Sequence, residues 1–179
     1  MLTQRLEGLE AAGVLVRMRL PPPVSAQVYE LTQWGYEAEP LFQALGRWAA
    51  RSPTHDPSLP LSAASLMLSF RTMLDPDRAD GFKARIAFEV DGEPFAARIR
   101  KGRIDIQRGA TDEPDVTLSG PARMIAAAVY GGQPLEQLVA DGVLKVTGDL
   151  AAAERFVRLF PLPAKAAAPP RRVAPTPLS

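Results

Sequence analysis

The residue types that most often carry out catalysis or bind metals are scarce in this sequence. It has no cysteine, which excludes disulfides and thiolate chemistry, and its single histidine, His55, lies among prolines in SPTHDPSLP. Asp75, Asp77 and Asp80 in DPDRAD lack the remaining ligands of a calcium loop. No nucleophile with a neighbouring base and no glycine-rich phosphate loop is visible. We therefore expect a protein that is not an enzyme and that has no catalytic residue, metal or cofactor.

Polar side chains that could contact a nucleic acid lie in the first twenty residues. Thr3, Gln4 and Arg5 form one edge of a segment with helical spacing and can offer donors to bases or phosphates. Arg17 and Arg19 follow on an alternating segment and can reach phosphates. A solvated surface is the alternative for both groups. With 21 basic and 20 acidic residues, the chain is close to neutral, which argues against tight DNA binding by one isolated copy.

Periodicity predicts a helix followed by a β-hairpin at the start of the chain. An apolar stripe predicts a helix over residues 1–12 that ends at Gly13, and the apolar face of this helix needs a partner. Alternation predicts a strand over residues 14–20, and VYELT predicts the returning strand after the triple proline at 21–23.

A second helix, expected from Glu37 onward, has a wide apolar face. Thr32, which lies before this helix in the chain, is a candidate N-cap for the helical region that follows it. So large an apolar surface beside so small a hairpin indicates packing within the chain or across a dimer. We expect a homodimer whose interface contains Leu41, Phe42, Leu45 and Trp48.

Composition divides the chain into four parts. Residues 52–62, SPTHDPSLPLS, contain three prolines and no periodicity, which is typical of a linker. We therefore expect an N-terminal segment at 1–51, a linker at 52–62, a second domain at 63–163 and a disordered tail at 164–179. No apolar run is long enough to span a membrane and no signal peptide is visible, so the cytoplasm is the expected location.

The segment after the linker predicts a mixed α+β domain. Three alternating stretches, KARIAFEV, FAARIR and RIDIQ, predict antiparallel strands, and DVTLS and VLKVTG predict two more. Helical spacing predicts four helices: one before the first strand, two between the fourth and fifth strands, and one after the fifth. The expected fold class is α+β, with a five-stranded, mostly antiparallel sheet covered by helices.

The inward positions of this domain are apolar, as both a packed core and a cavity for an apolar ligand require. Packing is the more frequent role for any one of these residues. The candidate ligand-binding set is Leu66, Phe70, Phe88, Phe95, Ile99, Ile104, Val129, Phe156 and Phe160.

Several residues of the first fifty match one family pattern in order and spacing: Leu6, Leu9, Gly13, Arg17, Tyr29, Leu31, Thr32, Gly35, Leu45 and Trp48. This segment resembles the C-terminal part of the HxlR-type winged helix-turn-helix regulators. The resemblance implies a recognition helix in the major groove, a wing on the DNA backbone and terminal helices that dimerise.

The segment also departs from that family. Its wing is lengthened by PPPVSAQ, and Trp34 stands where a small or charged residue is usual. The two or three helices that precede the recognition helix in the family are missing from this sequence. We therefore expect a partial winged helix, in a chain shortened at its N-terminus.

Four phrases in residues 63–163 match a second family: LSFRTMLDP, DGEPFAARIRKGRIDIQRG, DEPDVTLSGPARMIAAAVYGG and LVADGVLKVTGDLAAAERFVRLFP. This half looks like a sterol carrier protein type domain (SCP-2-like) of the bacterial kind. The resemblance implies a sheet covered by helices around an apolar tunnel for a fatty acyl chain or sterol, and it implies no reaction chemistry.

Two functions are compatible with this order of segments. In the first, the chain is a transcriptional regulator whose second domain senses an apolar small molecule. In the second, it is a non-enzymatic lipid or fatty-acyl carrier whose N-terminal segment only dimerises. An electrophoretic shift and a lipid titration would separate the two.

Overall fold

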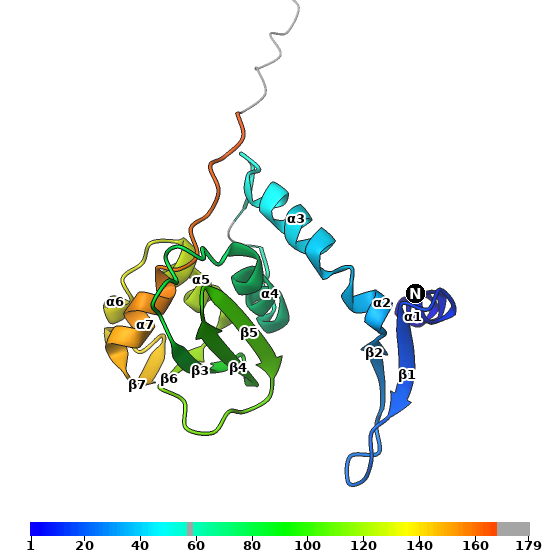
Figure 1. The fold of residues 1–179 in the computed structure, drawn as a ribbon. Coiled ribbons are helices and arrows are strands. Elements are labelled where there is room, and N and C mark those ends of the chain that lie inside the picture. The colour runs from blue at the N-terminus through cyan, green and yellow to red at the C-terminus, as the bar shows by residue number, and fades with distance from the viewer. Residues whose placement is uncertain (57–58, 168–179) are drawn as a thin grey trace, which may run out of the picture. The chain divides into compact units, whose positions relative to one another are not determined.

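The computed structural model describes residues 1–56 and 59–167, which belong to two compact units, Met1–Leu45 and Gly46–Ser179. The first unit contains helices α1 (Leu2–Ala11) and α2 (Gln33–Tyr36), strands β1 (Leu15–Arg19) and β2 (Gln27–Leu31), and the first half of α3 (Glu39–Ala50) (Figure 1). This order confirms the predicted helix, hairpin and second helix. α2 is an additional short helix that the periodicity did not separate from α3.

The hairpin of the first unit is a two-stranded antiparallel sheet. Its register runs from Leu15 opposite Leu31 to Arg19 opposite Gln27. Gly13, which follows α1, has a φ of +76°, a conformation that glycine adopts without strain and that lets the chain turn from the helix into β1.

Thr32 and Gly35 join the hairpin to α2. The Thr32 hydroxyl donates to the Gly13 carbonyl at 2.8 Å and accepts a hydrogen bond from the Gly35 N–H at 3.0 Å, so it is the expected N-cap. A Cβ at Gly35 would lie 2.2 Å from the Val14 carbonyl oxygen. Only a residue without a side chain therefore allows α2 to approach the hairpin this closely.

The second unit is built on a five-stranded sheet in the order β5-β4-β3-β6-β7. The strands are β3 (Ala84–Val90), β4 (Glu93–Arg100), β5 (Arg103–Arg108), β6 (Val116–Gly120) and β7 (Lys145–Gly148). The β3–β6 pair is parallel and the other three pairs are antiparallel, which confirms the mostly antiparallel sheet. The sequence pattern did not predict that β6 pairs with β3, since β4 and β5 lie between them in the chain.

Four helices cover the buried face of the sheet: α4 (Ala63–Met73), α5 (Ala122–Tyr130), α6 (Leu135–Ala140) and α7 (Leu150–Val157) (Figure 1). Ser62 caps α4 and Asp149 caps α7, each by accepting a hydrogen bond from a backbone N–H of the first turn. Alternate residues of β3 are buried under these helices, as the two-residue period of a strand requires.

The parts expected as linker and tail are only partly described. Residues 52–56 and 59–62 lie in no helix or strand. Of the expected disordered tail, residues 168–179 lie outside the described residues. Ala166 is described, and its N–H donates to the Arg51 carbonyl at 2.7 Å.

Candidate functional site

The candidate DNA-binding residues of α1 lie on its surface. Thr3, Gln4 and Arg5 are exposed in the first turn and a half of the helix. The helix as a whole has no buried residue. Its polar edge is therefore free to offer donors to a binding partner, and Leu2 and Leu9 of its apolar stripe are exposed while Leu6 is half-buried.

Arg17 and Arg19 lie two residues apart on β1, and so on the same face of this strand, but their surroundings differ. The guanidinium of Arg17 pairs with Glu10 of α1 at 3.1 Å and lies 5.3 Å from the centre of the Tyr29 ring. The ion pair joins the hairpin to the helix and the ring contact joins the two strands, and neither was predicted from the sequence. Arg19 lies exposed at the end of β1. Arg17 thus has a structural partner already, whereas Arg19 lies at an exposed strand end.

The apolar face of α3 is uncovered. Leu41, Phe42, Leu45 and Trp48 are all exposed, Trp48 at 70%. An exposed row of four large apolar side chains on one helix is unusual for a free surface and is typical of an interaction site.

Most of the candidate ligand-binding residues form a packed core. Eight of the nine are buried, and Ile104 is half-buried at the edge of the same cluster. The Phe70 ring centre lies 5.2 Å from that of Phe156 and 4.9 Å from that of Phe160, and the Phe70–Phe156 pair meets edge to face. Within this cluster the aromatic rings contact one another.

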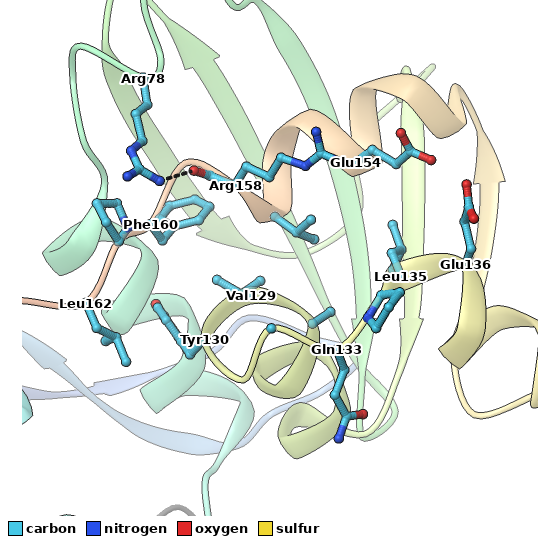
Figure 2. Close-up of a pocket in the computed structure, with 15 residues that line it drawn as sticks. Arg78, Val129, Tyr130, Gln133, Leu135, Glu136, Glu154, Arg158, Phe160 and Leu162 are labelled. Atoms are coloured by element: carbon cyan, nitrogen blue, oxygen red, sulfur yellow. Dashed lines mark hydrogen bonds between the residues drawn. The ribbon is translucent and has the colours of Figure 1, made fainter.

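A cleft of about 610 Å³ opens beside this core. It lies between the end of α5, the connecting residues 132–134, the start of α6, and α7 with the residues that follow it (Figure 2). Only Val129 and Phe160 of the candidate set line it. A volume of this size suits a small organic ligand.

The lining of the cleft combines apolar walls with charged side chains. Leu135, Val157 and Leu162 extend the apolar surface, while Arg78, Glu136, Glu154 and Arg158 bring charges (Figure 2). Arg78 is held in place, since its guanidinium donates to the Arg158 carbonyl at 3.1 Å and lies 3.5 Å from the Asp75 carboxylate. Such a lining suits an amphiphilic molecule better than a pure hydrocarbon.

Tyr130, at the end of α5, is the aromatic residue with a polar tip that lines this cleft. Its hydroxyl lies 2.7 Å from the Ser69 hydroxyl of α4. Burial raises the pKa of Tyr130 well above its ordinary value, so the phenol keeps its proton at physiological pH. The sequence analysis missed Tyr130 and Ser69. Tyr130 is the one polar-tipped side chain in the apolar run MIAAAVY, and this was the available signal.

The described residues were also considered for a metal site and for a membrane-spanning helix, and they contain neither. No group of three or more His, Asp or Glu side chains among them is arranged to hold a metal ion. None of the helices in the described ranges combines the length and the apolar character that crossing a membrane requires.

Comparison with known families supports both resemblances. Residues 67–161 match the model of the SCP-2 sterol transfer family, and residues 1–56 match that of the HxlR-like helix-turn-helix family. No curated protein matches the chain in sequence.

Among solved structures, the sec-alkylsulfatase Pisa1 from Pseudomonas sp. aligns with a TM-score of 0.51 and 19% identity. This alignment covers 60% of the present chain and only 17% of the sulfatase, so the chain spans about a sixth of that enzyme. At such identity the likeness concerns the fold alone. Sterol Carrier Protein 2 from Yarrowia lipolytica aligns with a TM-score of 0.45 and 18% identity, over 57% of this chain and 97% of that one.

The SCP-2 match covers more than half of the 179 residues and includes the whole sheet together with every residue that lines the cleft except Leu162. The HxlR-like match covers α1, the hairpin, α2 and α3. The chain therefore belongs to the SCP-2 sterol transfer family and carries an HxlR-like helix-turn-helix segment in front of its SCP-2 domain.

Proposed function

We propose that this protein is an HxlR-like transcriptional regulator whose SCP-2 domain binds an apolar small molecule and thereby changes DNA binding. The observation that carries the proposal is the presence of both family segments in one chain, residues 1–56 and 67–161. A domain that binds an effector and a segment that binds DNA are the two sites that an allosteric regulator needs. The role is one of binding, and we place the protein in the cytoplasm, where DNA is accessible.

The proposed DNA-contacting residues are Thr3, Gln4 and Arg5 on α1 and Arg17 and Arg19 on the hairpin. The exposure of the α1 edge and of Arg19 supports this assignment. Helix side chains can read base edges, while arginines on a hairpin can neutralise phosphates.

The proposed protein partner is a second copy of the chain. Four exposed apolar side chains on α3, namely Leu41, Phe42, Leu45 and Trp48, would be covered in a homodimer. Two copies would also double the number of phosphate contacts, which compensates for the nearly neutral charge of one chain.

The proposed division of labour follows the composition of the chain. Residues 1–51 bind DNA and dimerise, 52–62 connect, 63–163 bind the ligand, and 164–179 form a tail. Within the third part, Val129 and Phe160 line the cleft, and the other seven candidates belong to the packed core or lie at its edge. A ligand that enters between these rings would have to separate them.

An electrophoretic shift assay tests the DNA-binding half of the proposal. The full chain is titrated into a library of genomic fragments at low salt, and retained fragments are sequenced. We expect retention of a limited set of fragments, and weaker retention of the same set with Arg19→Ala. The absence of any shifted fragment at dimer-forming concentrations would contradict the regulator function.

A further inference from the structure

Two tight turns join neighbouring strands of the sheet in the second unit, and they share one backbone geometry. Asp91 and Gly92 join β3 to β4, with φ angles of +51° and +81°. Lys101 and Gly102 join β4 to β5, with φ angles of +50° and +67°. Positive φ at both central residues is typical of a type I′ turn, which prefers Asn, Asp or Gly at these positions. The first turn follows this preference, whereas the lysine of the second does not.

The residues that flank the second turn also differ from what strand pairing favours. Arg100 and Arg103 lie directly opposite each other in the β4–β5 register, and both are exposed. Like charges at opposed positions destabilise a pair of strands. At the same place beside the β3–β4 turn, Val90 lies opposite Glu93. Three cations therefore occupy the β4–β5 turn although local stability favours other residues there.

A fourth cation lies next to these three. Lys83 immediately precedes β3, and continuing the Ala84–Ile99 register by one residue places it opposite Arg100. Lys83 and Lys101 are both exposed. Among the residues that the structure describes, no carboxylate forms an ion pair with any of the four. We call this group the basic corner of the sheet: Lys83, Arg100, Lys101 and Arg103.

The arginines one pleat farther along the same face are balanced by carboxylates. Arg85 has Glu113 at 3.9 Å and Asp115 at 4.0 Å. Arg98 lies opposite Asp105 in the β4–β5 register. The excess of positive charge on this face is therefore concentrated at the end of the sheet that carries the β4–β5 turn.

Gly102 holds the basic corner in a defined position. A Cβ at this residue would lie 3.2 Å from the Pro76 carbonyl oxygen, so the turn packs against the loop that follows α4. Asp75 of that loop pairs with Arg78 at 3.5 Å. Because the turn is packed, its cations lose less conformational entropy when they bind a partner than cations on a free loop would.

We propose that the basic corner binds the phosphate backbone of duplex DNA and gives the second unit a DNA contact of its own. Neighbouring cations without carboxylate partners are complementary to a polyanion, and phosphate contacts need no particular base sequence. Duplex DNA is the polyanion that fits this chain, because residues 1–56 match the HxlR-like helix-turn-helix family. The inference rests on the proposed function, in which this chain binds DNA.

The basic corner also bears on the charge balance of the chain. With a formal net charge of +1, the protein cannot rely on its overall charge to bind DNA and needs local groups of cations. The basic corner would add its phosphate contacts to that of Arg19 on the hairpin. Because such contacts read no bases, they raise the affinity for every sequence and leave specificity to α1.

The salt dependence of DNA binding by the full chain tests the inference. Fluorescence anisotropy with one retained genomic fragment and one unrelated duplex gives the slope of log affinity against log salt concentration. We expect the double variant Arg100→Ala/Arg103→Ala to lower this slope by about 2 for both duplexes, since each lost phosphate contact lowers it by about 1. Arg98→Ala, on the same strand but opposite Asp105, is the matched control and should leave the slope unchanged.

Melting temperatures separate a binding surface from a structural role. Lys101→Asn removes one charge and supplies a residue that a type I′ turn prefers, so its melting temperature should not fall while its slope falls by about 1. The double variant should also keep the melting temperature of the parent protein, because it removes a repulsion between opposed arginines. A clear fall in the melting temperature of both variants would show that the cations stabilise the turn, and would overturn the inference.

Three results of the binding measurements would also overturn it. Unchanged slopes in the double variant and in Lys101→Asn would exclude the basic corner, while the proposed function would stand because the parent protein binds DNA. Loss of binding to phosphatidylglycerol vesicles in the double variant, with unchanged DNA slopes, would assign this surface to a membrane instead. If the parent protein binds neither duplex at low salt, both the inference and the regulator function fail.

Discussion

In residues 1–45, Leu15 is the one buried apolar side chain, and large apolar residues such as Trp34 and Leu41 are exposed. In the unit that follows, fully buried Phe70, Phe88 and Phe156 pack against each other and against the sheet. The hydrophobic effect stabilises a fold in proportion to the apolar area that it removes from water. The first unit therefore buries little apolar surface of its own and relies on local hydrogen bonds, whereas the second unit supplies its own core.

The largest expected effect comes from opening the core of the second unit. Phe156→Ala removes a fully buried ring that contacts Phe70, Phe88 and Phe160. We expect the free energy of unfolding to fall by about 3 to 5 kcal/mol, the usual cost of such a cavity. Urea denaturation followed by far-ultraviolet circular dichroism measures it. Leu150→Ala, which changes an exposed residue of the same helix, is the control, and an equal loss in both variants would contradict a self-sufficient core.

In the first unit, the sensitive position is expected to be a glycine rather than a core side chain. Gly35→Ala places a methyl group 2.2 Å from the Val14 carbonyl oxygen, so α2 must move away from β1. We expect destabilisation of about 2 to 3 kcal/mol from this overpacking. Amide hydrogen exchange of the β1–β2 hairpin measures it.

Gly8→Ala provides the matched control for that variant. A Cβ at Gly8 meets nothing within 4 Å, and alanine is the better helix former. Protection of α1 should rise slightly. If Gly35→Ala and Gly8→Ala behave alike, the close approach of α2 to the hairpin does not govern the stability of this unit.

The expected dependence on a partner is tested on α3. Trp48→Ala removes the most bulky of the exposed apolar side chains of that helix. We expect the dissociation constant of the homodimer to rise about 30-fold, as for a central aromatic residue of an interface. Sedimentation velocity measures it, with Arg47→Ala on the same helix as the control. A monomeric parent protein at micromolar concentration would remove the proposed explanation for the uncovered face.

The smallest expected effect concerns a single phosphate contact. Arg19→Ala should lower the slope of log affinity for DNA against log salt concentration by about 1. Fluorescence anisotropy at several salt concentrations measures the slope. Arg98→Ala, in the sheet of the second unit, should leave it unchanged. Equal slopes for Arg19→Ala and the parent protein would exclude Arg19 from the DNA interface.

Local patterns in the sequence predicted most of the elements correctly. Thr32 caps a helix, as expected, because an N-cap depends on a contact only three residues away. Alternation in KARIAFEV predicted which residues of β3 are buried, because that pattern follows from the geometry of a strand.

The candidate site was only partly predictable. Apolar composition indicated where a ligand domain would be, yet it could not separate residues that pack together, such as Phe70 and Phe156, from those that line the cleft, such as Val129 and Phe160. Both groups have the same side-chain chemistry. Which of them faces open space depends on contacts between elements that are distant in sequence.

By itself, the sequence determined the two families, the α+β class, the order of helices and strands, and the exposed polar edge of α1, since each depends on local spacing or on motifs. Only the tertiary structure decided that β3 pairs in parallel with β6, that Arg17 binds Glu10, and that Ser69 of α4 meets Tyr130 of α5. The last contact joins residues 61 positions apart in the chain. It places two hydroxyl groups together beside the cleft, which no local pattern in the sequence could indicate.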